Sequence, residues 1–87
     1  MRVSVIIPCF KANKTITSTL DSVFKQTMDD YEIILIDAGN TLDLNLLLPY
    51  QEALEKEILR IIPTEDTESP AENRNHGASL ARGEYIA

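Results

Sequence analysis

The residue best placed for chemistry in this sequence is Asp37, which directly follows the apolar run 31–36. A run of this kind is typical of a buried strand. A carboxylate at the end of such a strand can accept hydrogen bonds from a nucleobase N–H or a ribose hydroxyl. The sequence leaves a second interpretation open, because Asp is a common turn residue and Asp37 could simply cap the loop that follows.

Arg74 is the cation that could act with this carboxylate. It falls in the second turn of a helix that is predicted to begin at Pro70. A helix N-terminus attracts anions through its free N–H groups, and a guanidinium there could bind a phosphate or stack on a base. An exposed arginine that pairs with Glu72 or another acidic residue would explain Arg74 equally well.

The number and spacing of the glycine, cysteine and histidine residues exclude several kinds of site. The glycines at 39, 77 and 83 form neither a Walker A loop nor a Gly-x-Gly-x-x-Gly motif. The single cysteine and the single histidine cannot build a zinc site by themselves. Cys9 could be a nucleophile, but a small buried side chain is the favoured interpretation. We expect His76 to be a surface or packing residue.

Composition narrows the function classes further. The 87 residues include 8 Lys and Arg against 14 Asp and Glu, a net charge of −6. An acidic chain is a poor match for nucleic acid, so we expect no nucleic-acid partner. No apolar run approaches the roughly 20 residues that cross a bilayer, so we expect no transmembrane segment. The lone cysteine and the lack of a leader pattern favour a reducing, cytoplasmic location.

Strands and helices are predicted to alternate along the chain. The predicted strands cover residues 3–8, 31–37 and 57–62, and a fourth begins at 84. The predicted helices cover 14–26, 42–56 and 70–82. This order indicates an α/β fold, a three-layer α/β/α Rossmann-like parallel sheet. By analogy with doubly wound sheets, we expect the strand order 3-2-1-4.

Particular residues set the predicted ends of these elements. Pro8 and Pro63 should end their strands, because proline lacks a ladder donor. Pro49 should break the middle helix near Leu48. The expected N-caps are Asn13 and Ser69. The last helix should pack on the sheet through a face of small residues, Ala71, Ala78 and Ala81.

Parallel α/β sheets bind ligands beyond the carboxyl ends of their strands. The segments 8–11, 37–40 and 63–69 follow the first three predicted strands. We therefore expect these segments to meet at one edge of the sheet. That edge is the predicted ligand site.

Motifs along the whole chain point to a family. They are VSVIIPCF at 3–10, TLDSVFKQT at 19–27, YEIILID at 31–37, PAENRNHG at 70–77 and ARGEYI at 81–86. Together, in this order and at this spacing, they resemble the opening motifs of family 2 glycosyltransferases, which have the GT-A fold. The resemblance implies an inverting enzyme with a nucleotide-diphospho-sugar donor, expected to be a UDP-sugar.

The resemblance also implies binding residues. The nucleotide-sugar-binding positions carried over from the family are Pro8, Cys9, Phe10, Asp37, Gly39, Asn40, Asn73 and Arg74. In the family, an Asp-x-Asp motif that binds Mg²⁺ or Mn²⁺ follows the segment matched by 81–87. We therefore expect residues 1–87 to be a truncated N-terminal nucleotide-sugar-binding portion, with no metal ligand or catalytic residue of its own. We expect no sugar transfer from these residues alone.

Two departures from the family pattern keep an alternative open. Ala38 stands where the family usually has a second Asp, and Lys11 stands where it usually has Asn. The alternative is a non-catalytic nucleotide-binding or interaction module. A receiver-like domain is disfavoured, because no acidic pair follows the first strand. The free edge of that strand could also pair with a second copy, giving a homodimer. The acceptor, whether saccharide, lipid or protein, is not indicated, and a parent protein could act at the inner membrane face.

Overall fold

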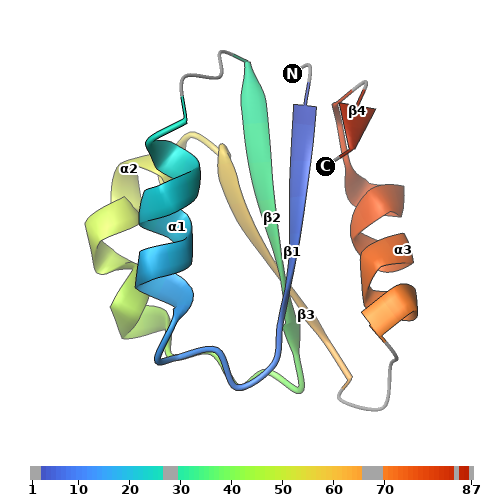
Figure 1. Ribbon diagram of the computed structural model, residues 1–87, viewed down its shortest axis with the longest axis horizontal. Coiled ribbons are helices and arrows are strands. Elements are labelled where there is room, and N and C mark those ends of the chain that lie inside the picture. The colour runs from blue at the N-terminus through green and yellow to red at the C-terminus, as the bar shows by residue number, and fades with distance from the viewer. Residues whose placement is uncertain (1–2, 27–29, 66–69, 84, 87) are drawn as a thin grey trace.

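A computed structural model describes residues 3–26, 30–65, 70–83 and 85–86 of the chain. Strands and helices alternate along it (Figure 1). In chain order the elements are β1 (Val3–Cys9), α1 (Ile16–Phe24), β2 (Tyr31–Ala38), the 3₁₀ helix η1 (Leu44–Tyr50), α2 (Gln51–Glu55), β3 (Leu59–Thr64), α3 (Pro70–Leu80) and β4 (Tyr85–Ile86).

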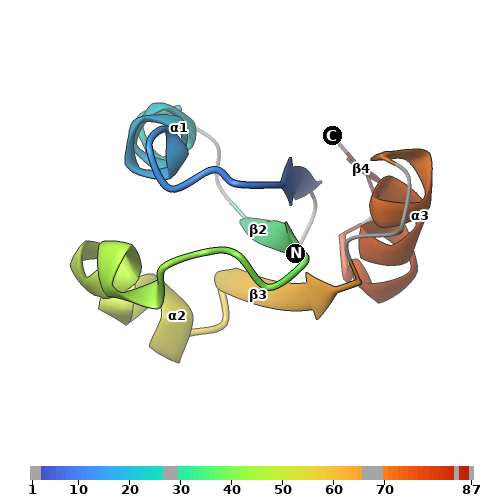
Figure 2. The same ribbon diagram turned by 90° about the horizontal axis from the view of Figure 1, so that it is seen from below.

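The strands form one parallel sheet of order β3-β2-β1-β4, which confirms the predicted order. Helices α1 and α2 cover one face of the sheet and α3 covers the other (Figure 2). The three-layer α/β/α architecture is therefore confirmed as well. Strand β4 pairs only with Val3 and Ser4. Within the described residues, the rest of that edge of β1 has no paired strand.

Strand β2 contributes to the hydrophobic core on both faces of the sheet, because successive side chains of a strand point to opposite faces. Ile33 and Leu35 pack with α1 and η1, where Leu20 and Leu47 are also buried. The opposite face of β2 carries a smaller cluster of buried apolar side chains. Its buried apolar residues are Ile6, Ile34 and Ile36.

Helix α3 lies close to this smaller face through residues with little or no side chain. Ala78 and Ala81 pack against the isoleucines, as predicted. Ala71 is exposed, so its predicted place on the packing face was wrong. The close approach of the helix at Gly77 was not predicted from the sequence. A Cβ there would lie 2.7 Å from Cγ2 of Ile6, so only glycine allows this approach.

Two prolines lie inside strands that they were predicted to end. Pro8 is part of β1 and Pro63 is part of β3. Alternation along β1 turns the nitrogen of Pro8 away from β2, because the Val3 N–H donates to the Asp30 carbonyl on that side. The same alternation turns the nitrogen of Pro63 to the outer edge of β3. Neither position needs a ladder donor, so each strand continues.

The boundaries of the other elements differ in detail from the prediction. Pro49 lies within η1, and α2 begins at Gln51, so the break follows Pro49 instead of preceding it. Helix α1 begins at Ile16 with Thr15 at the N-cap position, so Asn13 is not the cap. The predicted cap Ser69 lies outside the described residues.

Candidate functional site

The first two predicted segments meet beyond the carboxyl ends of the strands, and Thr64 at the start of the third contacts Gly39. Residues 66–69 of the third segment lie outside the described residues. We call this edge the carboxyl rim. It comprises residues 8–13, residues 37–43 and the N-terminal end of α3. Figure 1 shows all three at the same end of the sheet, at the bottom of the view. The rim is where the chain places the candidate ligand site.

Asn13 joins the first two segments, a role that the sequence analysis missed. Its Nδ2 donates to the carbonyl of Thr41 at 3.1 Å, and its Oδ1 accepts from the N–H of Asp43 at 2.7 Å. The N–H of Lys11 also donates to Oγ1 of Thr41 at 3.1 Å. The two loops therefore form one connected surface.

Asp37 is 1% exposed and organises its own loop. Its Oδ1 accepts hydrogen bonds from the N–H groups of Thr41, at 3.0 Å, and Leu42, at 3.1 Å. These bonds realise the loop-capping interpretation. Among the described residues, no hydrogen bond goes to Oδ2 of Asp37, although the side chain is almost fully buried.

The turn after Asp37 uses its backbone N–H groups within the chain, and the N–H of Asn40 donates to the carbonyl of Asp37 at 3.2 Å. Gly39 and Asn40 both have positive φ, 74° and 53°. Asn tolerates this region better than most residues, and Gly adopts it freely. The N–H of Gly39 donates to the carbonyl of Thr64 at 2.8 Å, which ties the turn to the end of β3.

Phe10 and Lys11 offer an aromatic face and a cation beside this turn. The Phe10 side chain is 57% exposed, and Pro8 before it is exposed as well. Nζ of Lys11 lies 5.3 Å from the centre of the Phe10 ring. Such a pair can contact a base by its ring and a phosphate by its ammonium group.

Cys9 lies between these residues but faces the core. Its side chain is 2% exposed and packs with the α1 face of the sheet. Burial, with a smaller contribution from the charge of Asp37, raises the pKa of the Cys9 thiol to about 11. The thiol is therefore protonated at neutral pH, and its structural interpretation, not a nucleophilic one, fits the structure.

Arg74 and Asn73 lie in the half of α3 nearest the rim. Arg74 is exposed. The ion pairs found among the described residues include none between Arg74 and Glu72, the alternative raised by the sequence. The side chain of Asn73 lies outside the described residues, so its predicted contact is not placed.

Comparison with known proteins decides the family. The sequence model of glycosyl transferase family 2 matches residues 4–87. This chain belongs to glycosyltransferase family 2. The resemblance drawn from the motifs is thus confirmed.

Curated relatives of this family 2 chain are glycosyltransferases. It is 36% identical over 89 residues to the poly(ribitol-phosphate) beta-glucosyltransferase of Bacillus spizizenii, covering 99% of this chain and 14% of the relative. It is 31% identical over 84 residues to the glycosyltransferase GlyG of Streptococcus pneumoniae, covering 97% of this chain and 28% of the relative. The chain therefore spans well under a third of these relatives.

Solved structures give the fold of the family 2 chain independently. S. aureus TarS, solved in complex with UDP-GlcNAc, superposes with a TM-score of 0.78 at 27% identity, over 99% of this chain and 25% of TarS 1–349. The mannosyltransferase PcManGT of Pyrobaculum calidifontis, solved with GDP-Man and Mn²⁺, superposes with a TM-score of 0.68 at 25% identity, over 98% of this chain and 26% of that one. The fold is that of the N-terminal part of a GT-A domain.

No metal site is built from the described residues of this family 2 chain. They contain no group of three or more His, Cys, Asp or Glu side chains that could hold an ion. Asp37 uses one oxygen for its own loop, so it is not a free bidentate ligand. Nor do the described residues include a helix long and apolar enough to cross a membrane.

A second buried carboxylate, Glu32, lies at the amino end of the same strand, and the sequence analysis missed it. Its side chain has no exposed area. It accepts from Oγ of Ser4 at 2.6 Å, from Nη2 of Arg60 at 2.8 Å and from the N–H of Arg82 at 2.6 Å. The sequence did carry a signal for this site, since Glu32 lies within an otherwise apolar predicted strand. A buried charge requires partners, so a buried polar cluster could have been expected there.

These partners decide the charge of Glu32. Burial alone would raise the pKa of its carboxyl group. The hydrogen bonds from Ser4, the Arg82 N–H and Arg60, with the Arg60 charge, outweigh burial and lower the pKa from 4.5 to about 2. Glu32 is therefore ionised throughout the physiological range.

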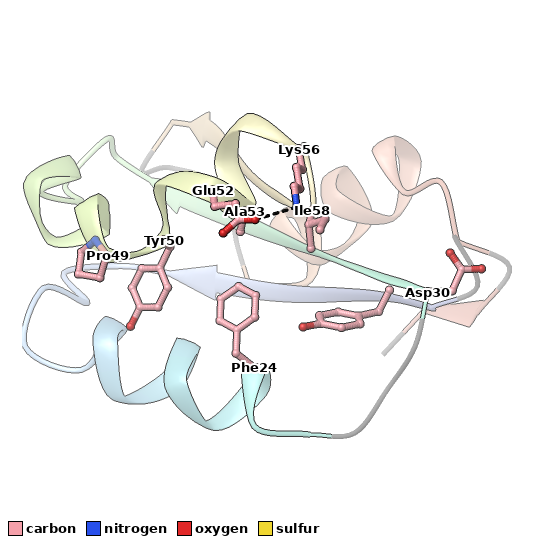
Figure 3. A pocket seen from close by; sticks show the side chains of 9 residues that line it. Phe24, Asp30, Pro49, Tyr50, Glu52, Ala53, Lys56 and Ile58 are labelled. Carbon is pink, nitrogen blue, oxygen red and sulfur yellow. Dashed lines mark hydrogen bonds and ion pairs between the residues drawn. The ribbon is translucent and has the colours of Figure 1, made fainter.

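A cavity of about 570 Å³ lies away from the rim. It is lined by residues of α1, η1 and α2 and by residues near the starts of β2 and β3, and Phe24 and Tyr50 are among them (Figure 3). The two rings are stacked with centroids 5.6 Å apart. A hydrogen bond to Asp21, together with burial, raises the pKa of Tyr50 to about 12. None of the predicted site residues lines this cavity, so it is not the candidate donor site.

Proposed function

We propose that this chain is the N-terminal nucleotide-sugar-binding portion of a glycosyltransferase that takes its sugar from a nucleotide-diphospho-sugar, with a UDP-sugar as donor. The family membership supports the reaction class, and UDP-GlcNAc in TarS supports the donor. The acceptor hydroxyl displaces the nucleoside diphosphate in one in-line step with inversion. The single cysteine favours a cytoplasmic location for this part of the protein.

The observation that carries the proposal is the pairing of two features at the carboxyl rim. Asp37 is held through Oδ1, and we assign its Oδ2 to a base N–H or a ribose hydroxyl of the donor. Phe10, which directly follows β1, presents an exposed ring at the same rim. A fixed acceptor and an aromatic face at one rim are a suitable arrangement for a nucleoside.

The other rim residues complete the proposed site. The backbone at Pro8, Gly39 and Asn40 shapes the nucleoside pocket, and Asn73 and Arg74 contact the base and diphosphate. Cys9 supports this pocket from the core and does not touch the ligand. The described residues supply no metal ligands, so a Mg²⁺ or Mn²⁺ ion, such as the Mn²⁺ bound by PcManGT, would need ligands from elsewhere in a longer protein.

Asp37→Asn tests this role sharply, because it separates loop capping from ligand binding. The amide oxygen of Asn keeps the acceptor that Thr41 and Leu42 use, while the NH₂ group replaces Oδ2 by a donor. We expect the variant to keep its folded stability and to bind UDP about tenfold more weakly in calorimetric titration, the effect of one hydrogen bond to a charged group. Asp43→Asn is the matched control, because Asp43 caps η1 through the N–H of Asn45 and lies at the exposed side of the same loop.

The second candidate is a non-catalytic nucleotide-binding or interaction module. It is favoured by the burial of Asp37 and by Ala38 in place of the second family Asp. If the wild-type protein binds neither UDP nor UDP-GlcNAc at millimolar concentration, the donor-binding proposal is wrong. If it binds UDP but the full-length protein transfers no sugar, the nucleotide-binding module is the correct alternative.

A further inference from the structure

We propose that Glu32 is a positioning residue for the donor site, acting through the tilt of α3. The group that does this, which we call the latch, consists of Ser4, Glu32, Arg60 and Arg82. It lies at the amino end of the sheet, far along α3 from Arg74. This inference rests on the proposed function, because it assigns a consequence for donor binding to residues that do not touch the donor.

The latch holds the C-terminal end of α3. Nη2 of Arg60 donates both to Oε1 of Glu32 at 2.8 Å and to the carbonyl of Leu80, the last residue of the helix, at 2.6 Å. The N–H of Arg82, just beyond the helix, donates to Oε2 of Glu32 at 2.6 Å. One carboxylate thus fixes both the last carbonyl of α3 and the turn that follows it.

The other side of the latch is anchored in the sheet. Oγ of Ser4 on β1 donates to Oε2 of Glu32 at 2.6 Å and accepts from the N–H of Gly83 at 2.8 Å. Nη2 of Arg82 also donates to the carbonyl of Glu57, before β3, at 2.6 Å. Residues on or beside three strands therefore hold the C-terminal end of α3. These contacts fix that end of the helix to the sheet.

Gly77 is the second point that fixes α3, and it lies between the latch and the rim. A Cβ there would be 2.7 Å from Ile6 and 3.2 Å from Ile36, so the helix backbone rests directly on the sheet. Leu80 follows Gly77 by three residues and Arg74 precedes it by three. At 1.5 Å rise per residue, each lies about 4–5 Å along the axis from this contact.

The two halves of α3 differ in the exposure of their described side chains. Toward the rim, Ala71, Glu72, Arg74 and Asn75 are exposed, whereas Ala78 and Ala81 pack on the sheet. Arg74 lies on the same helix as Gly77, so its position follows the direction of the helix axis that Gly77 and the latch fix. If the latch is released, the helix can pivot at Gly77, and Arg74 moves relative to Asp37 and Phe10.

A double-mutant cycle tests this coupling in the full-length protein. Titrations with UDP and with uridine are compared for the wild type, Glu32→Gln, Arg74→Ala and the double variant. We expect Glu32→Gln and Arg74→Ala each to weaken UDP binding about tenfold and to leave uridine binding nearly unchanged, because Arg74 serves the diphosphate. The double variant should bind UDP no more weakly than Arg74→Ala alone.

Two outcomes of the cycle would overturn the proposal. One is additive losses, since Glu32 would then act independently of Arg74. The other is an equal loss for UDP and uridine, which indicates general loosening of the rim. Glu52→Gln is the matched control, because it removes an exposed ion pair with Lys56 and should leave both affinities unchanged.

Amide hydrogen exchange separates this proposal from the proposed function. Glu32→Gln should speed exchange in α3 and at residues 82–83 while β2 and β3 stay protected. If the wild type binds no UDP, the proposed function fails, and faster exchange in α3 still supports positioning of the helix by Glu32. Unchanged exchange in α3 contradicts that positioning whatever the nucleotide result. Ser4→Ala, which removes one neutral partner, replaces Glu32→Gln in these measurements if the latter does not fold.

Discussion

The two ends of strand β2 each bury a carboxylate, and they use it in opposite ways. Glu32 at the amino end uses both oxygens, and its partners come from β1, β3 and the residues after α3. Asp37 at the carboxyl end has a single oxygen engaged among the described residues, by N–H groups of its own loop. Glu32 joins segments that are distant in the chain. Asp37 orders a local turn through Oδ1, and its Oδ2 accepts no hydrogen bond from the described residues.

This difference follows from the side of the sheet that each side chain faces. Glu32 faces the α3 layer, where the apolar cluster is small and polar contacts hold the helix. Asp37 lies on the alternate side, at the point where the large α1 cluster ends. Both oxygens of Glu32 have hydrogen-bond partners, which suits a structural role. One oxygen of Asp37 has none among the described residues, which is consistent with its proposed role in ligand binding.

The largest expected difference between the two ends is in stability. Glu32→Ala leaves Arg60 partly buried without its carboxylate, and removing one partner of a buried pair costs about 3 kcal/mol or more. We expect the free energy of unfolding, measured by urea denaturation, to fall by this amount. A loss no greater than that of Glu52→Ala, at an exposed ion pair, would contradict the structural role of Glu32.

The pH dependence of stability sharpens the role of Glu32. Its pKa is about 2 in the folded chain and near 4.5 when unfolded, so the unfolded chain binds more protons between these values. The stabilisation is present above about pH 4.5 and is lost as the pH falls toward 2, by about 3 kcal/mol in all. Urea midpoints measured across this window should fall steeply for the wild type and less steeply for Glu32→Gln. Parallel curves would count against the lowered pKa.

The smallest expected change is at the other end of the strand. Asp37→Ala removes the acceptor for the N–H groups of Thr41 and Leu42, and the loss of a cap of this kind costs about 1–2 kcal/mol. Calorimetric unfolding should show this modest loss, and hydrogen exchange should increase only in residues 39–43. Destabilisation as large as that of Glu32→Ala would mean that the two ends do not differ in the way proposed.

Much of the fold could be predicted from local pattern. The apolar runs at 31–36 and 3–7 indicate buried strands, and alternation with helical segments indicates a parallel sheet. The proline boundaries were wrong because the effect of Pro8 and Pro63 depends on which edge their nitrogens face. That orientation is a property of the paired sheet and is not visible in the run itself.

The candidate site was predicted only in part, for a related reason. Placing Asp37, Phe10 and Arg74 toward one end of the sheet needs only the rule for parallel strands. Burial of Cys9 was the favoured interpretation from the sequence, and its 2% exposure confirms it. The loop bridge by Asn13 depends on contacts across about 30 residues, and no local signal distinguishes it from a helix cap.

The sequence by itself determined the family, the strand order and the end of the sheet where a ligand belongs, because motif order and hydrophobic period are local and repeat along the chain. Only the tertiary structure decided which buried carboxylate is saturated and which retains a free acceptor. Hydrogen bonds from Arg60 and Arg82 reach Glu32 from segments 28 and 50 residues away, and such partners are defined only when the chain is folded.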